Sequence, residues 1–513
     1  MKILLVNQSS FISTGYGIMG KEFLTRASKE YEVAELACDT HHNHPMISQV
    51  PWKVYPNLPL DNEKQEYESN RVNTYGRWKF EKICLEFKPT HVISWRDNWM
   101  DSFIGRSPLK KCYNWIYMPT IDAPGQDKEW LHDYTLADSL ITYQNWSKNQ
   151  LDLESGGRIN TKVGSIGSYM HPLSNRLELK EKLGLGGVVI GTVMRNQGRK
   201  RFPELFRAFK RILEKHPNTI LYCHTSHPDM DGWNIPRYLL EYNIQNNVVF
   251  TMYCQNCQDT WPSRYKGKLS HCPNCKQKSA VMSTAAKSLT NEQMNIMYNL
   301  FDIYVQFSNC EGFSIPILES SMAGTPVLYT DYSAMVDVGK RCGGKPLNIN
   351  CDYREPHSER WFAAPSEDNL VSEINRFINM NEEEKQQWRK SSHEKASAEF
   401  SWDKFYQTIK GEITGLKPRS YDCPPDIKNP QPFPSFKMTN SQFVRWCIEN
   451  VLYEPEKINT YFEARILEEL ESTVRHTGTS FININPKLIY DEMCKIRNYT
   501  NMLESYRCQK SST

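Results

Sequence analysis

The sequence predicts an α/β protein built from two similar halves, each a parallel sheet wrapped by helices. Its 513 residues are enough for three or four structural units of ordinary size. Short apolar runs alternate with amphipathic segments along most of the chain, which is typical of buried strands alternating with covering helices. This alternation begins again near residue 187, so we expect one domain over residues 1–170 and a second over residues 171–415.

The first domain opens with a strand over residues 2–7, a loop that contains Gly15 and Gly17, and a helix that extends to residue 26. An amphipathic helix is predicted over residues 71–87. Four further strands are predicted over residues 33–38, 91–95, 113–118 and 139–143.

The second domain shows the same alternation. Its strands are predicted over residues 188–194, 219–224, 247–252, 302–307 and 325–329. Its helices include residues 202–215 and 291–300. The polar, cysteine-bearing stretch that follows the third of these strands is longer than the loops of a compact domain, and we expect an inserted module over residues 252–282.

Four cysteines in the insertion form two C-x-x-C pairs separated by fourteen residues. They are Cys254, Cys257, Cys272 and Cys275. This spacing predicts a zinc ribbon in which four thiolates surround Zn²⁺. Because all four positions are cysteines, we expect the zinc to be structural.

The inserted ribbon is also basic. Its cationic residues are Arg264, Lys266, Lys268, Lys276 and Lys278, against the single acidic residue Asp259. Trp261 and Tyr265 lie among them, which makes the ribbon a candidate contact for nucleic acid or another polyanion. The alternative is an ordinary solvated basic face. The ribbon leaves the carboxyl end of a strand, so we expect it to overhang the ligand-binding cleft.

The chain beyond residue 415 changes character. Six prolines within residues 417–436 predict an extended linker, which we place over residues 416–438. Residues 439–508 show heptad-like apolar spacing, which predicts a small helical accessory region.

Charge and apolar patterning exclude several classes of protein. Lys and Arg total 62 against 59 for Asp and Glu, a formal charge of +3, so no chain-wide field favours nucleic acid or an anionic membrane. The apolar run at the N-terminus is too short for a signal peptide or a membrane span, and we expect a cytoplasmic protein without transmembrane segments. An odd number of cysteines, 15, then favours reduced thiols.

The most informative motif runs over residues 309–327, where a strand is followed by a helix. Glu311 and Glu319 flank the start of that helix, and Gly312 permits close backbone approach. Free N–H groups and the helix dipole at such a start form a site for a phosphate. The sequence therefore predicts an anion site with two carboxylates beside it.

A second motif covers residues 191–200, again between a strand and a helix. It contains Arg195 and Lys200, and fixed cations of this kind stabilise a leaving diphosphate in a transition state. Arg199 and Arg201 lie close by, so the partner of Arg195 stays open.

The glycine loop after the first strand has two interpretations. Gly15, Gly17 and Gly20 fit the G-x-G-x-x-G pattern of dinucleotide-binding proteins. Only Asp39 is placed as the acidic residue that such a site needs. The alternative is a loop that lies against the phosphates of another nucleotide ligand.

Together these segments resemble retaining glycosyltransferases of the GT-B fold, the group 1 type with an E-x7-E signature. The resemblance implies two Rossmann-like domains that face each other across a cleft. It implies sugar contacts for Glu311, ribose contacts for Glu319, and catalytic roles for Arg195, Lys200 and Glu311. Residues with implied donor-binding roles are Gly15, Gly17, Gly312, Phe313, Ser314, Ile315 and Glu319.

One departure from the family concerns the first domain. The family carries a histidine that contacts the donor sugar, whereas this chain has residues 117–122 there without a histidine. Asp122 is the candidate substitute, which leaves the identity of the donor sugar open.

The resemblance implies a retaining hexosyl- or pentosyltransferase that uses a nucleotide-diphosphate sugar, needs no catalytic metal and acts on an acceptor that the sequence does not identify. Two alternatives remain. One is a glycosyltransferase that acts on modified nucleic-acid bases, with the ribbon contacting the polynucleotide. The other is a nucleic-acid-binding or scaffold protein with an inactive core.

Overall fold

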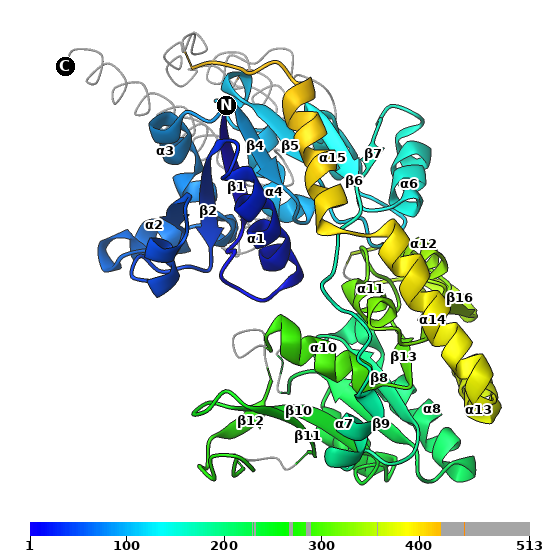
Figure 1. Cartoon of the computed structure of the whole chain (residues 1–513). Helices are drawn as coiled ribbons and strands as arrows, with labels where there is room; N and C mark the ends of the chain where they lie inside the picture. Colours follow the sequence, from blue (N-terminus) through cyan, green and yellow to red (C-terminus); the bar gives the residue numbers. More distant parts are fainter. Residues whose placement is uncertain are drawn as a thin grey trace, which may run out of the picture. The chain divides into compact units, whose positions relative to one another are not determined.

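A computed structural model describes residues 1–421, with short gaps, and Trp446 (Figure 1). The gaps are residue 228 and residues 230–231, 266–269, 284–288 and 357. The predicted linker is therefore described only as far as residue 421, and the predicted helical region over residues 439–508 lies outside the described residues except for Trp446.

The chain divides into two compact units. The first comprises Met1–Trp78, Pro89–Arg106 and Asn114–Pro418. The described parts of the second are Lys79–Lys88, Ser107–Tyr113 and residues 419–421, where Arg419 donates hydrogen bonds to the carbonyl oxygens of Lys110 at 3.1 Å and Tyr113 at 2.9 Å. All residues of the candidate site belong to the first unit.

The first sheet has seven parallel strands in the order β3-β2-β1-β4-β5-β6-β7. They are β1 (Lys2–Gln8), β2 (Glu32–Cys38), β3 (Lys53–Pro56), β4 (His91–Ser94), β5 (Asn114–Tyr117), β6 (Ser139–Thr142) and β7 (Lys162–Val163). Residues 3–6 of β1 are completely buried, as expected for a central strand covered on both faces. The five predicted strands are confirmed, whereas the short edge strands β3 and β7 carry little apolar signal.

Six helices lie between these strands in the described sequence, and the third belongs mostly to the second unit. They are α1 (Gly15–Ala27), α2 (Lys64–Glu68), α3 (Arg77–Phe87), α4 (Asn98–Gly105), α5 (Lys128–Thr135) and α6 (Asn145–Ser155). The helix predicted over residues 71–87 is interrupted. A 3-10 turn over Arg71–Tyr75 precedes α3, and Gly76 separates the two with a φ of 102°, which is outside the helical region.

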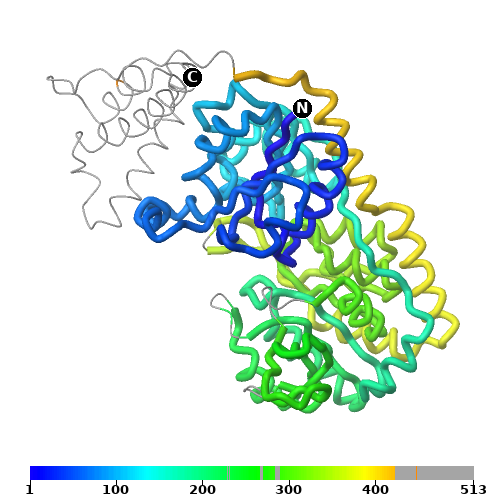
Figure 2. The backbone as a smooth tube through the Cα atoms, turned by 60° about the vertical axis from the view of Figure 1, so that its left-hand side comes forward, coloured from blue at the N-terminus to red at the C-terminus, as the bar shows by residue number. Residues whose placement is uncertain are grey.

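The second sheet contains parallel strands in the order β10-β9-β8-β13-β14-β15. They are β8 (Val189–Val193), β9 (Ile220–His224), β10 (Val248–Cys254), β13 (Ile303–Gln306), β14 (Val327–Thr330) and β15 (Lys345–Leu347). A separate antiparallel pair is formed by β16 (Ile349–Arg354) and β17 (Trp361–Pro365). The five strands predicted in this half are confirmed. In Figure 2 the backbone can be followed from the blue and cyan segments of the first half to the green segments of the second.

Within the described residues, nine helices follow β7. They are α7 (Arg176–Lys182), α8 (Phe202–Lys215), α9 (Ile235–Glu241), α10 (Asn291–Leu300), α11 (Ile315–Met322), α12 (Ala334–Arg341), α13 (Glu367–Asn379), α14 (Glu382–Glu399) and α15 (Trp402–Gly415). Helix α15 returns to the first sheet (Figure 1). Ile409 and Ile413 of α15 share an apolar core with Ile3 of β1, and Asp403 pairs with Arg26 of α1 at 2.9 Å.

The cysteine-bearing insertion continues the second sheet. Strand β10 extends two residues beyond its predicted end, and β11 (Thr260–Arg264) and β12 (Ala280–Met282) both pair with it in antiparallel fashion. The insertion is therefore joined to the sheet by backbone hydrogen bonds along a shared strand.

No helix in the described part of the chain is both long enough and apolar enough to cross a membrane.

Candidate active site

Glu311 is buried in a cluster of cations and hydrogen-bond donors beyond the carboxyl end of β13. Its carboxylate forms an ion pair with Lys200 and lies 3.1 Å from Nη1 of Arg199. It also accepts hydrogen bonds from Ser308 Oγ at 2.7 Å and from Gln306 Nε2 at 2.8 Å. Glu311 is therefore fixed in one position by groups from two segments, the loop after β8 and the end of β13.

The charges in this cluster fix its protonation. Burial opposes ionisation of Glu311, but the charges of Lys200 and Arg199 lower the pKa of its carboxyl to about 2. Burial and the nearby Arg199 lower the pKa of Lys200 to about 8, against the attraction of Glu311. Burial also disfavours the charge of Arg199, yet Glu311 raises the pKa of that guanidinium above its usual range. At neutral pH the site holds one carboxylate and two cations.

Arg195 has a different environment. Its side chain is 59% exposed and its Nε lies 2.8 Å from Oδ2 of Asp229. The structure thus brings together Lys200, Arg199 and Glu311, and it places the guanidinium of Arg195 on Asp229. Arg199 was one of the two arginines that left the partner of Arg195 open in the sequence.

The loop before α11 ends in an unusual backbone conformation. Ser314, which precedes the helix, has φ 71° and ψ 65°, in the left-handed region. Its hydroxyl is buried and has no hydrogen-bond partner among the described residues. Phe313 is buried between the rings of Tyr143 and Phe400, with centroid distances of 6.1 and 6.0 Å. The first turn of α11 therefore presents an unsatisfied hydroxyl together with its free N–H groups.

Gly312 and Gly15 mark close approaches between segments far apart in sequence. A Cβ added to Gly312 would lie 2.2 Å from Cγ2 of Thr120, and one added to Gly15 would lie 2.8 Å from Cδ1 of Ile315. Gly312 also accepts a 2.9 Å hydrogen bond from Gln144 at its carbonyl oxygen. Gly15 thus lies against the start of α11, whereas Gly312 lies against Thr120, in the segment after β5.

Gly17 has a local role. A Cβ at this position would lie 2.1 Å from the carbonyl oxygen of Ile12, so only glycine fits the turn that leads into α1. Its N–H donates to Thr14 Oγ1 at 3.2 Å, which caps the helix. Nothing about Gly17 by itself indicates a ligand.

Glu319 lies on α11, eight residues after Glu311. Its carboxylate accepts a 2.7 Å hydrogen bond from the hydroxyl of Tyr298 on α10. Burial raises the pKa of Glu319 to about 7, and the hydrogen bond from Tyr298 offsets only part of that increase. Unlike Glu311, this carboxyl titrates near neutral pH.

A second polar group lies on the side of the first sheet. Burial and the charge of Asp122 raise the pKa of Asp97 to about 6. The hydroxyl of Tyr16 lies 3.3 Å from Asp97 and 2.8 Å from Oγ1 of Thr120. Arg360, which precedes β17, forms an ion pair with Asp122. Asp97 and Arg360 were not predicted. Asp97 could have been found because it follows the carboxyl end of β4, where ligands of parallel sheets bind, but Arg360 has no such signal.

The four predicted metal ligands form a compact group. Their sulfur atoms all lie within 4.8 Å of one another, with Cys254 and Cys275 3.6 Å apart and Cys257 and Cys272 also 3.6 Å apart. Four thiolates around zinc at about 2.3 Å would be separated by about 3.8 Å. The cluster therefore fits a tetrahedral ion such as Zn²⁺.

Each cysteine pair has the turn expected of a zinc knuckle. The N–H of Cys257 donates to Sγ of Cys254 at 3.4 Å, and the residues after each pair, Gln258 and Lys276, have φ values of 58° and 64°. Of the basic residues predicted to contact nucleic acid, Lys266 and Lys268 lie outside the described residues.

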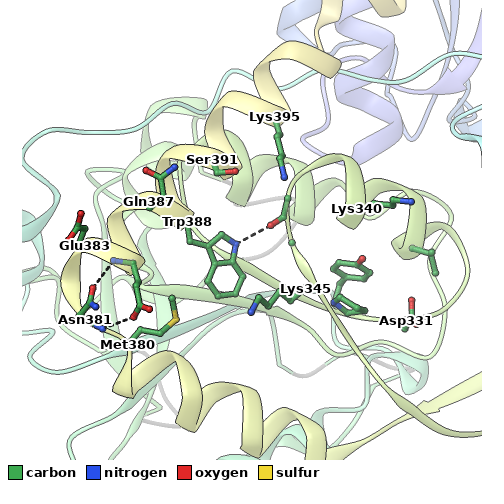
Figure 3. A pocket seen from close by; sticks show the side chains of 16 residues that line it. Asp331, Lys340, Lys345, Met380, Asn381, Glu383, Gln387, Trp388, Ser391 and Lys395 are labelled. Carbon is green, nitrogen blue, oxygen red and sulfur yellow. Dashed lines mark hydrogen bonds between the residues drawn. The ribbon is translucent and has the colours of Figure 1, made fainter.

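A cavity of about 1000 Å³ lies elsewhere, between α12 and α14. Trp388 occupies its centre in Figure 3 and donates a 3.0 Å hydrogen bond to the carbonyl oxygen of Gly343. Its rim carries Lys340, Lys345 and Lys395. None of the predicted site residues lines it.

Comparison with known proteins identifies the fold. No protein-family model and no curated protein matches the sequence. Among solved structures, sucrose-phosphate synthase from Thermosynechococcus elongatus is similar over 81% of this chain and 99% of its own, with a TM-score of 0.59 and 15% identity. The chain has the GT-B fold.

Two further structures share the GT-B fold with this chain. HepE of Anabaena, solved in complex with UDP and glucose, matches over 81% of this chain and 100% of its own, with a TM-score of 0.55 and 16% identity. A glycosyltransferase from Rickettsia africae matches over 81% and 99%, with a TM-score of 0.55 and 11% identity. At these identities the likeness establishes the architecture of two Rossmann-like domains.

Proposed function

We propose that the chain is a retaining glycosyltransferase, a hexosyl- or pentosyltransferase that moves a sugar from a nucleotide-diphosphate donor to an acceptor still to be identified. The observation that carries the proposal is the buried cluster of Glu311, Lys200 and Arg199 beside the start of α11 in a GT-B fold. Similar structures with bound UDP and glucose support a donor of this class.

The cations and the helix start form the proposed diphosphate site. Lys200 and Arg199 are already fixed by Glu311, and the hydroxyl of Ser314 lacks a partner among the described residues. Arg195 completes the site when its guanidinium exchanges Asp229 for the diphosphate. Preorganised charge of this kind stabilises the negative charge that grows on the leaving phosphate.

The two glutamates have different proposed contacts. Glu311 is ionised throughout the neutral range and accepts hydrogen bonds from hydroxyls of the donor sugar. Glu319, further along α11, accepts hydrogen bonds from the ribose. Gly312 and Gly15 keep the surrounding backbone close, because neither approach leaves room for a side chain.

Retention of configuration requires attack on the face from which the diphosphate leaves. In the proposed reaction the bond between the anomeric carbon and the phosphate oxygen breaks, and the bond to the acceptor oxygen forms on the same face. The acceptor proton passes to the leaving phosphate oxygen. No protein nucleophile and no catalytic metal is needed, and the protein contributes position and charge.

The cysteine cluster is the proposed site of a structural Zn²⁺. Zinc would hold the two knuckles together and fix the end of β10. All four coordination positions are filled by thiolates, which leaves none for substrate.

Thermal stabilisation and slow donor hydrolysis across a panel of nucleotide sugars test this function. We expect one donor class to raise the melting temperature and to be hydrolysed, and Glu311→Gln to abolish hydrolysis, whereas Glu394→Gln on the exposed side of α14 should change neither. A folded, zinc-loaded protein that responds to no nucleotide sugar would contradict the proposal.

The same panel, together with titrations of DNA and RNA at several salt concentrations, separates the alternatives. An enzyme acting on nucleic-acid bases would also bind DNA or RNA with a steep salt dependence. A scaffold with an inactive core would bind polynucleotide and no donor.

A further inference from the structure

Helix α10 connects the cysteine cluster to Glu319. Its first turn contacts the first zinc knuckle through Gln293, whose Nε2 donates a 3.1 Å hydrogen bond to the carbonyl oxygen of Gln258. Near its last turn, the hydroxyl of Tyr298 donates to Glu319 at 2.7 Å. One rigid helix of ten residues therefore contacts both groups.

Gln293 makes two contacts with its one amide group. Its Oε1 accepts a 2.9 Å hydrogen bond from the N–H of Thr290, while the hydroxyl of Thr290 accepts one from the N–H of Gln293 at 3.2 Å. These two bonds form a capping box that starts α10. Only the contact to Gln258 requires the amide N–H, because glutamate would serve the capping box equally well.

The carbonyl that Gln293 contacts is oriented by the knuckle itself. Gln258 directly follows Cys257, and its left-handed backbone with φ 58° closes the turn. Its N–H donates to the carbonyl oxygen of Cys254 at 2.9 Å. Without a metal, the turn loses the ion that holds both knuckles in place.

The other end of α10 is equally well fixed. The hydroxyl of Thr325 donates to the carbonyl oxygen of Tyr298 at 2.9 Å, and the Tyr298 ring packs edge-on against Phe301 with centroids 5.8 Å apart. Among the described residues, Tyr298 is the one that donates a hydrogen bond to the carboxylate of Glu319. A shift of α10 therefore changes the position or the hydrogen bonding of Glu319.

We propose that metal binding at the cysteine cluster sets donor affinity through α10, with Gln293 and Tyr298 as positioning residues for Glu319. This inference rests on the proposed role of Glu319 in nucleotide binding. The zinc ribbon then has a role in donor binding besides its role in stability.

The test compares UDP affinity, measured by titration calorimetry, in zinc-loaded protein and after chelation. In the natural chain we expect chelation to weaken binding at least about 5-fold, the lower end of ordinary coupling between two sites. Gln293→Glu keeps the capping box but cannot donate to Gln258. It should weaken binding by a similar factor while zinc is bound, and chelation should add little further.

Glu292→Gln, on the same exposed turn, is the matched control and should respond to chelation as the natural chain does. Equal UDP affinity with and without zinc, or an undiminished response to chelation in Gln293→Glu, would overturn the inference. If chelation unfolds the protein, the UDP affinity of zinc-loaded Gln293→Glu, compared with that of the zinc-loaded natural chain, still tests the inference.

Tyr298→Phe tests the second contact. It removes one hydroxyl and keeps the ring, so the pH dependence of UDP binding should move to higher pH as Glu319 loses its donor. An unchanged pH profile would contradict the positioning role. The proposed function fails separately, if no nucleotide binds the zinc-loaded chain under any of these conditions.

Discussion

Lys200 and Glu311, 111 positions apart in the sequence, form an ion pair in which each side chain is only 8% exposed. A buried pair of this kind is costly to break, because removal of one partner leaves the other charge without compensation. The pair belongs to the proposed donor site, so its loss should affect stability and turnover together.

Lys200→Met should lower the free energy of unfolding by about 3 kcal/mol, the usual result of removing one partner of a buried pair. Turnover should fall at least about 100-fold as the charge opposite the diphosphate is lost. Denaturant unfolding and donor hydrolysis measure the two effects. Lys210→Met, at an exposed position of α8, should change neither. A Lys200 variant as stable as the natural chain would show that the pair is not formed.

Arg195→Ala should separate catalysis from stability. The side chain of Arg195 is 59% exposed, whereas Asp229, on which it lies, is 10% exposed. Removal of the Arg195 side chain should therefore lower the free energy of unfolding by about 1 kcal/mol, well below the cost expected for Lys200→Met. If Arg195 turns to the diphosphate, turnover should fall about 100-fold. Arg207→Ala removes an ion pair of similar exposure, with Glu367, and should leave turnover intact. Full activity in Arg195→Ala would mean that Arg199 and Lys200 alone stabilise the leaving diphosphate.

Gly312→Ala should disturb the contact between the loop before α11 and the segment after β5. Its methyl group would lie 2.2 Å from Cγ2 of Thr120, and overpacking of this size costs about 1–3 kcal/mol. Thr120→Ser removes that Cγ2 and keeps the hydroxyl that contacts Tyr16. The double variant should regain most of the lost stability and turnover. No recovery would mean that position 312 requires glycine for its own backbone conformation and not for the contact with Thr120.

The pKa of Glu319, raised to about 7 by burial, predicts a specific pH dependence of stability. The fold favours the protonated form, so this residue destabilises the protein increasingly as pH rises from its unfolded pKa toward 7. Between pH 4.5 and pH 7.5, the free energy of unfolding of Glu319→Gln should therefore rise by about 1–3 kcal/mol relative to that of the natural chain. Denaturant unfolding across this range provides the measurement. A difference that is independent of pH would place an ordinary carboxyl at this position.

The cysteine cluster should hold one zinc ion per chain. Cys272→Ser should reduce the metal content and lower the melting temperature, whereas Cys351→Ser, at an exposed cysteine outside the cluster, should do neither. Elemental analysis of purified protein and thermal unfolding provide the readouts. A metal-free natural chain with full stability would exclude a structural ion.

Much of the fold could be predicted from local patterns. The bounds of α8 and α10 match the predicted ranges, because both helices combine an amphipathic face with clear end signals, such as the capping box of Thr290 and Gln293. The end of β10 could not be predicted, since its last residues are paired with strands of the inserted ribbon. The hairpin of β16 and β17 is largely exposed along β16 and carries no apolar alternation.

The residue types of the candidate site stand out in the sequence, whereas their arrangement in space does not. Glu311 and Lys200 were identified by their motifs, but the orientation of Arg195 depends on Asp229, 34 residues away in a loop. The sequence does not distinguish Arg199 from Arg195, because both are arginines of the same loop. The path of that loop determines which of them pairs with Glu311. Asp97 follows the end of β4. Arg360 lies in the hairpin of β16 and β17, which has no clear signal in the sequence.

Titration of the preferred nucleotide sugar and of its free nucleoside diphosphate into the natural chain and Glu311→Gln tests the central claim most directly. The account predicts that the natural chain binds the sugar-bearing donor more tightly than the free diphosphate, and that Glu311→Gln loses this preference. The affinity of Glu311→Gln for both ligands changes as well, because Glu311 fixes Lys200 and Arg199. The same preference for the sugar-bearing donor in both proteins would contradict the assignment of Glu311 to the donor sugar.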